Sequence, residues 1–207
     1  MTNPSKQELE ARVDLAAALR WADRLGLGEG ICNHFSVEIP GRPGHFLINP
    51  QGLHWSEVTP GDLVVVDAAG RKVEGRYGVE PTAFFIHGAM HRSKPSAKCV
   101  LHTHMPYATT LTVLHGGRLE WASQNSLKFF GRVAYDDNYN GLALDDAEGE
   151  RMCAQAKAAD VLFLANHGII VSGPSVAAAF DDLYYLERAC MLQVLAMGTG
   201  QPLRMIP

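Results

Sequence analysis

The sequence predicts a single mixed α/β domain in which helices cover both faces of a sheet. Short apolar runs bounded by turn residues intermix with longer segments of helical spacing, without strict strand–helix alternation. At 207 residues the chain is long enough for one sizeable core. Because no repeat, low-complexity tract or linker interrupts it, we expect one domain over residues 1–207.

The first half of the chain is predicted to contain one helix and three short strands. The residues from Ser5 to Glu8 form a capping-box pattern, and apolar residues then recur at helical spacing to about residue 25, where glycines interrupt the pattern. Apolar runs between turn residues predict the strands. These strands are expected at 34–38, 45–48 and 63–67.

The second half is predicted to contain four helices and three strands. Pro81 and Pro106 each favour the first turn of a helix, and acidic residues open the next one. The helices are expected at about 81–92, 106–114, 145–158 and 174–197, and the strands at about 98–104, 161–165 and 169–171.

Composition limits the classes of partner. The chain is 47% hydrophobic and 19% charged, as is typical of globular proteins, and its net charge of −4 comes without a Lys/Arg run. We therefore expect no nucleic-acid and no membrane partner. The N-terminus lacks a signal-peptide core, so a cytoplasmic location is expected. Four cysteines without CxxC spacing are interpreted as reduced packing residues.

The most informative pattern is the triplet from His102 to His104 at the end of an apolar run. Residues i and i+2 of an extended chain share a face, so both imidazoles should point the same way. A second apolar run ends in Asn166-His167-Gly168. Two strands that each deliver histidine at an end predict a three-histidine metal site with one position open for substrate. The alternative is a set of ordinary surface histidines, but Gly168 permits close backbone approach and favours the metal site.

Five separated motifs, in the same order, make the chain resemble the class II aldolase/adducin family from about residue 9 to residue 194. The resemblance is closest to adducin-like bacterial members. The motifs are residues 46–53, 58–64, 91–95 leading into the His-x-His strand, the later His-Gly turn, and 184–190.

The resemblance implies a fold, an assembly and a metal. The fold is a three-layer α/β/α sandwich with a largely antiparallel central sheet. The assembly is a homotetramer with active sites between subunits. The ligands of a divalent metal would be His102, His104 and His167, with zinc expected first and manganese or iron as alternatives.

One departure from the family concerns the acid/base group. Sugar-phosphate aldolases of the family carry a glutamate in a Ser-Ser-Glu motif, and Ala83 stands in its place here, after Pro81 and Thr82. Glu80 is the nearby carboxylate and the candidate base; its alternative role is to favour a helix N-terminus. Tyr139 is a candidate proton donor, as tyrosines are in the family.

A second departure concerns the phosphate-binding turns of the family, which are altered here. Asn33 and the Gly52 backbone N–H remain candidates for binding an anion, and otherwise are turn residues. His34 is a candidate contact for a carboxylate, with a structural role as its alternative. We therefore expect a carboxylate or unphosphorylated substrate rather than a sugar phosphate.

Three further polar residues are interpreted as structural. His87 and His91 are four apart on a predicted helix and resemble a metal pair, but fall at a packing position of the family and at the helix end. Glu187 lies on an otherwise apolar helix face, where an ion pair with Arg188 is expected.

Together these features predict a divalent-metal-dependent lyase that cleaves a C–C bond beside a carbonyl in a small hydroxylated carboxylic acid or sugar-like molecule. Decarboxylation of an aromatic or keto acid needs the same metal chemistry and stays open, as does epimerisation. A non-catalytic assembly module like the adducin head is the remaining alternative, but such a module has no need of three metal ligands.

Overall fold

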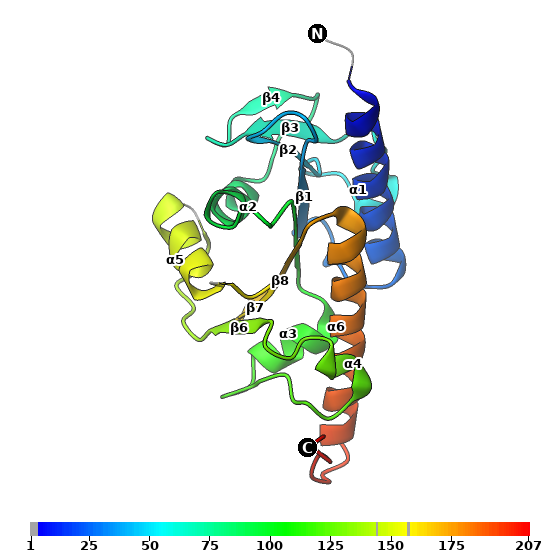
Figure 1. Cartoon of the computed structure of the whole chain (residues 1–207), viewed down its shortest axis with the longest axis vertical. Coiled ribbons are helices and arrows are strands. Elements are labelled where there is room, and N and C mark those ends of the chain that lie inside the picture. The colour runs from blue at the N-terminus through cyan, green and yellow to red at the C-terminus, as the bar shows by residue number, and fades with distance from the viewer. Residues whose placement is uncertain (1–3, 144, 157) are drawn as a thin grey trace.

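The computed structural model describes residues 4–143, 145–156 and 158–207. One eight-stranded sheet runs through the molecule, and helices lie on both of its faces (Figure 1). The strands are β1 (His34–Glu38), β2 (His45–Ile48), β3 (Val64–Asp67), β4 (Lys72–Glu74), β5 (Cys99–Thr103), β6 (Val133–Asp136), β7 (Val161–Leu164) and β8 (Gly168–Gly173).

The strand order is β4-β3-β2-β1-β5-β8-β7-β6. Every neighbouring pair is antiparallel apart from β6 and β7, which are parallel. The largely antiparallel three-layer sandwich is therefore confirmed.

In the described part of the chain, six α-helices form the two outer layers. They are α1 (Lys6–Arg24), α2 (Pro81–Ser93), α3 (Pro106–Thr112), α4 (Gln124–Leu127), α5 (Asp146–Ala156) and α6 (Val176–Met197). Helices α1, α3, α4 and α6 cover one face, where the larger hydrophobic core lies, and α2 and α5 cover the other (Figure 1).

The predicted elements agree with the structure to within a few residues at each end. Helix α1 starts where expected because Ser5 Oγ accepts the Glu8 N–H at 3.1 Å. Helix α5 was expected to reach about residue 158, and residue 157 lies outside the described part of the chain. Four short elements were missed: β4, β6, α4 and a 3-10 turn at Trp55–Glu57. They span only three or four residues, too few for a periodic pattern to emerge.

The alternation of side chains in β1 and β5 creates a polar row on one face of the sheet. Phe35 and Leu101 point into the core beneath α1 and α6. The residues directly before and after these two in each strand point to the opposite face, toward α2. Because His34 pairs with His102 in the register of the two strands, their side chains lie next to each other, and Ser36 follows on the same face. The sheet thus sets histidines opposite the polar residues of α2.

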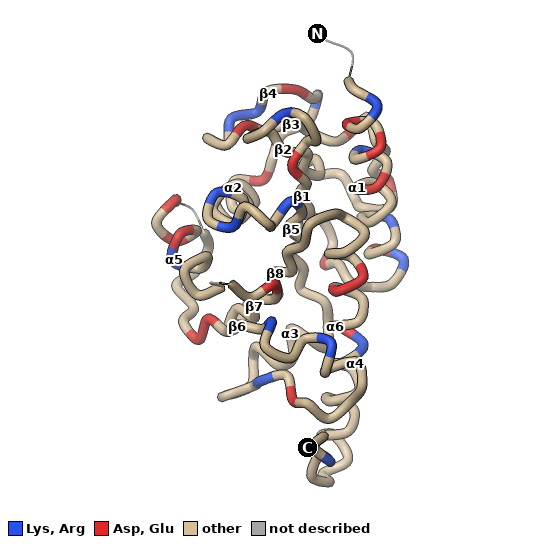
Figure 2. Tube along the Cα trace, in the orientation of Figure 1, with Lys and Arg blue, Asp and Glu red and all other residues tan. Residues whose placement is uncertain are grey.

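The outer surface carries both signs of charge. Figure 2 shows basic positions interspersed with acidic ones along α1 and around β3 and β4. Of the four cysteines, Cys99, Cys153 and Cys190 are buried and Cys32 is exposed. Within the described residues, no helix combines the length and the apolar character needed to cross a membrane.

Candidate metal centre

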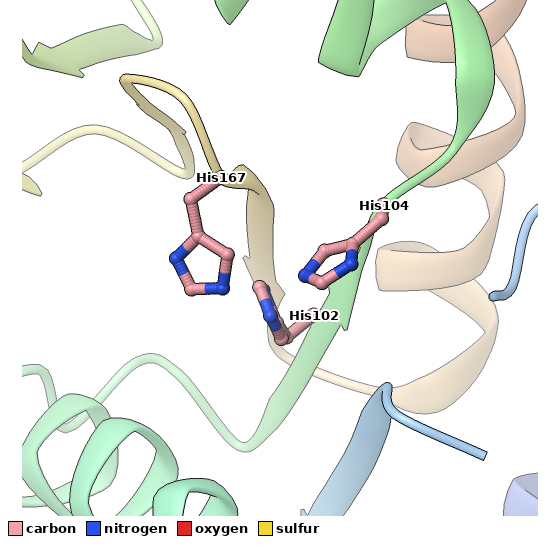
Figure 3. Close-up of side chains that lie close together, drawn as sticks. All are labelled: His102, His104 and His167. Atoms are coloured by element: carbon pink, nitrogen blue, oxygen red, sulfur yellow. The ribbon is translucent and has the colours of Figure 1, made fainter. Parts of the chain in front are cut away.

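Three histidines from two separate parts of the sheet meet at one point. One nitrogen of each of His102, His104 and His167 lies within 4.8 Å of the others. The ring centroids are 4.8 to 5.1 Å apart. Figure 3 shows the three rings converging on a common space from the end of β5 and from the β7–β8 turn. The three histidines named from the sequence pattern are therefore brought together.

The β7–β8 turn is tight enough to hold His167 beside β5. Asn166 takes a left-handed conformation (φ 55°), which asparagine tolerates better than most residues. A Cβ on Gly168 would lie 2.6 Å from His104 Cδ2 and 2.6 Å from the Thr103 carbonyl oxygen. Only glycine permits this approach, so Gly168 is required for the three rings to meet.

Hydrogen bonds select the nitrogen that two of these histidines present. His102 Nδ1 lies 3.0 Å from the Ile169 carbonyl oxygen, and His104 Nδ1 lies 2.6 Å from Glu29 Oε2. Both oxygens only accept, so each Nδ1 carries the proton and each Nε2 keeps its lone pair. His104 Nε2 is buried and has no hydrogen-bond partner among the described residues. This donor set fits a divalent cation, since metal-bound histidines commonly donate their other N–H in this way.

Burial keeps two of the imidazoles, those of His102 and His167, in the neutral form that binds metals. Burial lowers the pKa of His102 well below its usual value, and the neighbouring histidines lower it further. Burial also lowers the pKa of His167 to about 4, with further contributions from His104 and His34. At neutral pH neither ring needs to lose a proton before it binds a cation.

His34 and Glu80 lie directly beside the three histidines. The His34 ring stacks on His102 with centroids 5.8 Å apart, and His34 Nε2 lies 3.1 Å from Glu80 Oε2. Glu80 is the N-cap of α2, where it accepts from Ala83 N–H and from the Thr82 hydroxyl. Burial raises its pKa, but the contacts with His34, Thr82 and Ala83 together lower it to about 2. Glu80 is therefore an ionised partner of His34.

Behind His34, a directed hydrogen-bond chain fixes His87. His91 Nδ1 donates to the Ala97 carbonyl at 2.7 Å, so its Nε2 accepts from the Ser36 hydroxyl at 2.8 Å. Ser36 has one proton to give, so His87 Nδ1 donates to Ser36 Oγ at 2.6 Å. His87 Nε2 keeps a lone pair. His87 and His91 are thus both members of this hydrogen-bond chain.

Asn33, Gly52 and Tyr139 were also named from the sequence, and of these Asn33 contacts the backbone of His104. Asn33 is buried, and its Oδ1 accepts the His104 backbone N–H at 3.2 Å. Gly52 occupies an exposed turn with φ 80° and open space around it. Tyr139 lies on the loop after β6 and is 55% exposed.

The expected ion pair between Glu187 and Arg188 is wrong. The Glu187 carboxylate accepts the backbone N–H groups of Tyr107 and Ala108 at 2.8 and 2.9 Å. Burial raises its pKa, while these two hydrogen bonds lower it less. Consecutive helical residues point about 100° apart, so Arg188 does not share the buried face. Glu187 instead holds the start of α3, directly after His104.

The buried histidines of the α2 face predict a loss of stability in acid. Burial lowers the pKa of His91 to about 4 and that of His87 well below its usual value. Since the unfolded chain binds these protons at about pH 6.5, the free energy of unfolding should fall as the pH drops from 6.5 toward 4. For His91 alone the loss amounts to about 3 kcal/mol at most.

Urea denaturation of the metal-free protein at several pH values measures this loss. His91→Gln should flatten the pH dependence, while the same change at exposed His115 serves as the control. Equal pH slopes for wild type and His91→Gln would contradict the assignment.

Two polar residues that contact the histidines were not predicted from the sequence. Glu29 contacts His104 from 75 residues away, and Ser36 joins His87 to His91. Glu29 stands in a glycine-rich loop without any local pattern. For Ser36 a signal was present, because it is two residues from His34 and so shares its face of the strand.

The family is shown by a profile described as Class II Aldolase and Adducin N-terminal domain, which matches residues 13–194. The fold and the histidine site define a protein of the class II aldolase type. The chain belongs to this family, as its motifs indicated.

Two curated relatives have different named roles. The decarboxylase NovR of Streptomyces niveus is 31% identical over 189 residues, which cover 90% of this chain and 70% of that protein. Alpha-adducin of Rattus norvegicus is 36% identical over 201 residues, which cover 94% of this chain but only 27% of adducin.

Two solved structures share the fold over nearly the whole chain. An aldolase II superfamily protein from Pseudomonas syringae superimposes with a TM-score of 0.93 at 40% identity, covering 98% of this chain and 82% of that one. The L-fuculose 1-phosphate aldolase from Glaciozyma antarctica PI12 gives 0.87 at 27% identity, covering 97% and 78%.

Proposed function

We propose that this protein is a divalent-metal-dependent lyase that cleaves a C–C bond beside a carbonyl in a small hydroxylated carboxylic acid or sugar-like substrate. The observation that carries the proposal is the set of three imidazoles with ligand nitrogens within 4.8 Å of one another. Three protein ligands leave a coordination position free for substrate, as in catalytic rather than structural metal sites. Zinc is the proposed metal, with manganese and iron as alternatives.

A divalent cation held by His102, His104 and His167 supplies Lewis-acid stabilisation of the electron pair left on carbon when the bond breaks. The protein's own residues handle the proton. We assign proton transfer to the His34–Glu80 pair. In this pair Glu80 Oε2 lies 3.1 Å from His34 Nε2, so the carboxylate orients the imidazole and places a negative charge beside it. Because its contacts with His34, Thr82 and Ala83 lower its pKa to about 2, Glu80 is a weak base, and we propose that its contribution passes through His34.

We assign the substrate carboxylate to two further donors, Asn33 Nδ2 and the backbone N–H of Gly52. Asn33 Nδ2 is a buried donor that lacks a partner in the described part of the chain. Gly52 lies in an exposed turn, where an added Cβ would meet no atom within 4 Å, and its backbone N–H is the second proposed donor. Together with His34, these groups suit a carboxylate better than a phosphate. A phosphate would favour a cluster of basic side chains, and the sequence has no Lys/Arg run.

Decarboxylation is the second candidate. It is supported by the similarity to the decarboxylase NovR and by Ala83, which stands where sugar-phosphate aldolases of the family carry a glutamate. Loss of CO₂ leaves a carbanion that needs only protonation, so one proton donor is sufficient. A non-catalytic assembly role is the third candidate, supported by the similarity to alpha-adducin.

We also propose a homotetramer with sites between neighbouring subunits. In that arrangement the exposed Tyr139 would reach the site of a neighbour and donate a proton there. Sedimentation at micromolar protein concentration is expected to give four chains per particle. A monomer under these conditions would contradict both the assembly and the role of Tyr139.

Metal analysis followed by two product assays tests the proposed function. Purified protein should contain about one divalent ion per chain. A panel of hydroxy and keto acids would then be assayed in parallel for released aldehyde or pyruvate and for released CO₂. Aldehyde or pyruvate supports the aldolase, and CO₂ supports the decarboxylase. Metal-free protein that binds no added zinc would overturn both and favour the assembly module.

A further inference from the structure

The loop between α1 and β1, residues 25–33, reaches across to the ligand His104. Its Glu29 carboxylate lies 2.6 Å from His104 Nδ1, a contact between residues 75 apart in the sequence. The Glu29 side chain is 67% exposed, whereas that of His104 is only 20% exposed. The carboxylate is therefore exposed to solvent on one side, while on the other it accepts a hydrogen bond from a largely covered ring.

Asn33 joins the loop to the backbone of the same histidine. Its Oδ1 accepts two N–H groups, that of Glu29 at 2.9 Å and that of His104 at 3.2 Å. Asn33 is itself held by Asn49, whose Nδ2 donates to the Asn33 carbonyl at 3.2 Å. One buried amide oxygen thus fixes the positions of the carboxylate and of its histidine relative to each other.

A close contact with Trp55 fixes the loop from below. A Cβ on Gly28 would lie 2.8 Å from Trp55 Cζ3, so the loop backbone rests directly on the indole ring. Trp55 is 2% exposed and packs against Phe35 in β1, with ring centroids 4.7 Å apart. The loop is therefore placed by the core, and Glu29 is delivered to His104 by a rigid support.

This arrangement decides which nitrogen of His104 is available. A carboxylate accepts only, so the proton is held on Nδ1 and the lone pair on Nε2, which faces the other two histidines. Without Glu29 the ring would exchange between its two tautomers and would lose the contact that fixes its rotation. The His104 side chain would then no longer be held in one orientation, although it would still be present as a ligand.

We propose that Glu29 is a positioning residue for the metal ligand His104, and that Asn33 and Gly28 hold it in place. The inference rests on the proposed metal site but assigns a role outside its ligands. A carboxylate that accepts from a metal-bound histidine fixes the ring and raises its basicity, and loss of such a partner typically weakens metal binding 10- to 100-fold.

Zinc affinity, measured by competition with a coloured chelator, tests the proposal without a substrate. Glu29→Ala should weaken Zn²⁺ binding by roughly 10- to 100-fold, and Glu29→Gln by less, because the amide oxygen still accepts from Nδ1. Glu57→Gln, at an exposed carboxylate on the neighbouring 3-10 turn, is the matched control and should bind like wild type. Wild-type affinity in Glu29→Ala would overturn the proposal.

Nitrogen-15 spectra of the histidines in the metal-free protein give a second readout that is independent of metal. Wild type should show His104 protonated on Nδ1 alone, and Glu29→Ala should show a mixture of tautomers. Gly28→Ala, which displaces the loop from Trp55, should reproduce that mixture with Glu29 still present. An unchanged His104 tautomer in Glu29→Ala contradicts the positioning role, whereas absence of zinc binding by wild type would contradict the proposed function instead.

Discussion

His104→Ala should reduce the metal content from about one ion per chain to near zero and remove all turnover, while the fold survives. One of three ligands is lost, and the remaining two imidazoles no longer surround a cation. The ring lies beyond the last residue of β5, so its removal leaves the sheet register intact. Elemental analysis measures the metal content, and thermal unfolding monitored by circular dichroism shows whether the fold survives.

The control for this variant is His115→Ala, which removes an exposed imidazole from the surface. Both variants should unfold at similar temperatures when metal-free. Full metal retention by His104→Ala would show that the cation, if present, is bound elsewhere in the protein.

The second large effect is expected for Glu80→Gln. This variant removes the charge beside His34 and should lower kcat by roughly 10²- to 10⁴-fold, the usual contribution of a positioned acid/base group. The metal content should not change, since Glu80 contacts His34 and not the three ligands. Weaker capping of α2 should cost about 1 kcal/mol of stability.

Thr82→Val is the matched control for Glu80→Gln. It removes a hydroxyl from the same carboxylate oxygen but leaves the charge and the 3.1 Å contact with His34. Its kcat should stay within a few-fold of wild type. If Glu80→Gln turned over at the wild-type rate, the proton donor would be a tyrosine or a water molecule, and decarboxylation would become the favoured reaction.

The sequence contained enough information for the six inner strands of the sheet and for the meeting of the three histidines. Strong apolar runs marked β5, β7 and β8, and the two-residue period of a strand placed His102 and His104 on one side. The His-Gly pair predicted a close backbone approach, and a Cβ on Gly168 would indeed lie only 2.6 Å from the Thr103 carbonyl oxygen of β5. These features are local, so short-range rules were sufficient to predict them.

The surroundings of the histidines depend on contacts between distant parts of the chain. Glu187 was assigned to its neighbour Arg188, yet it binds the start of α3 about 80 residues earlier. Glu29 lies in a loop whose path is set by the Trp55 ring rather than by any periodic pattern. Such partners are determined by tertiary packing, which the spacing of residues along one element does not reveal.

The polar row on β1 and β5 has a consequence for how the chain folds. A slip of β5 by one residue between β1 and β8 would turn His102 toward α1 and α6, among apolar side chains. The imidazole would then be buried without the Ile169 carbonyl, at a cost of about 1–3 kcal/mol. Mispaired sheets are thereby disfavoured before any cation is bound. The histidine that is a candidate metal ligand thus also favours the native register of the sheet during folding.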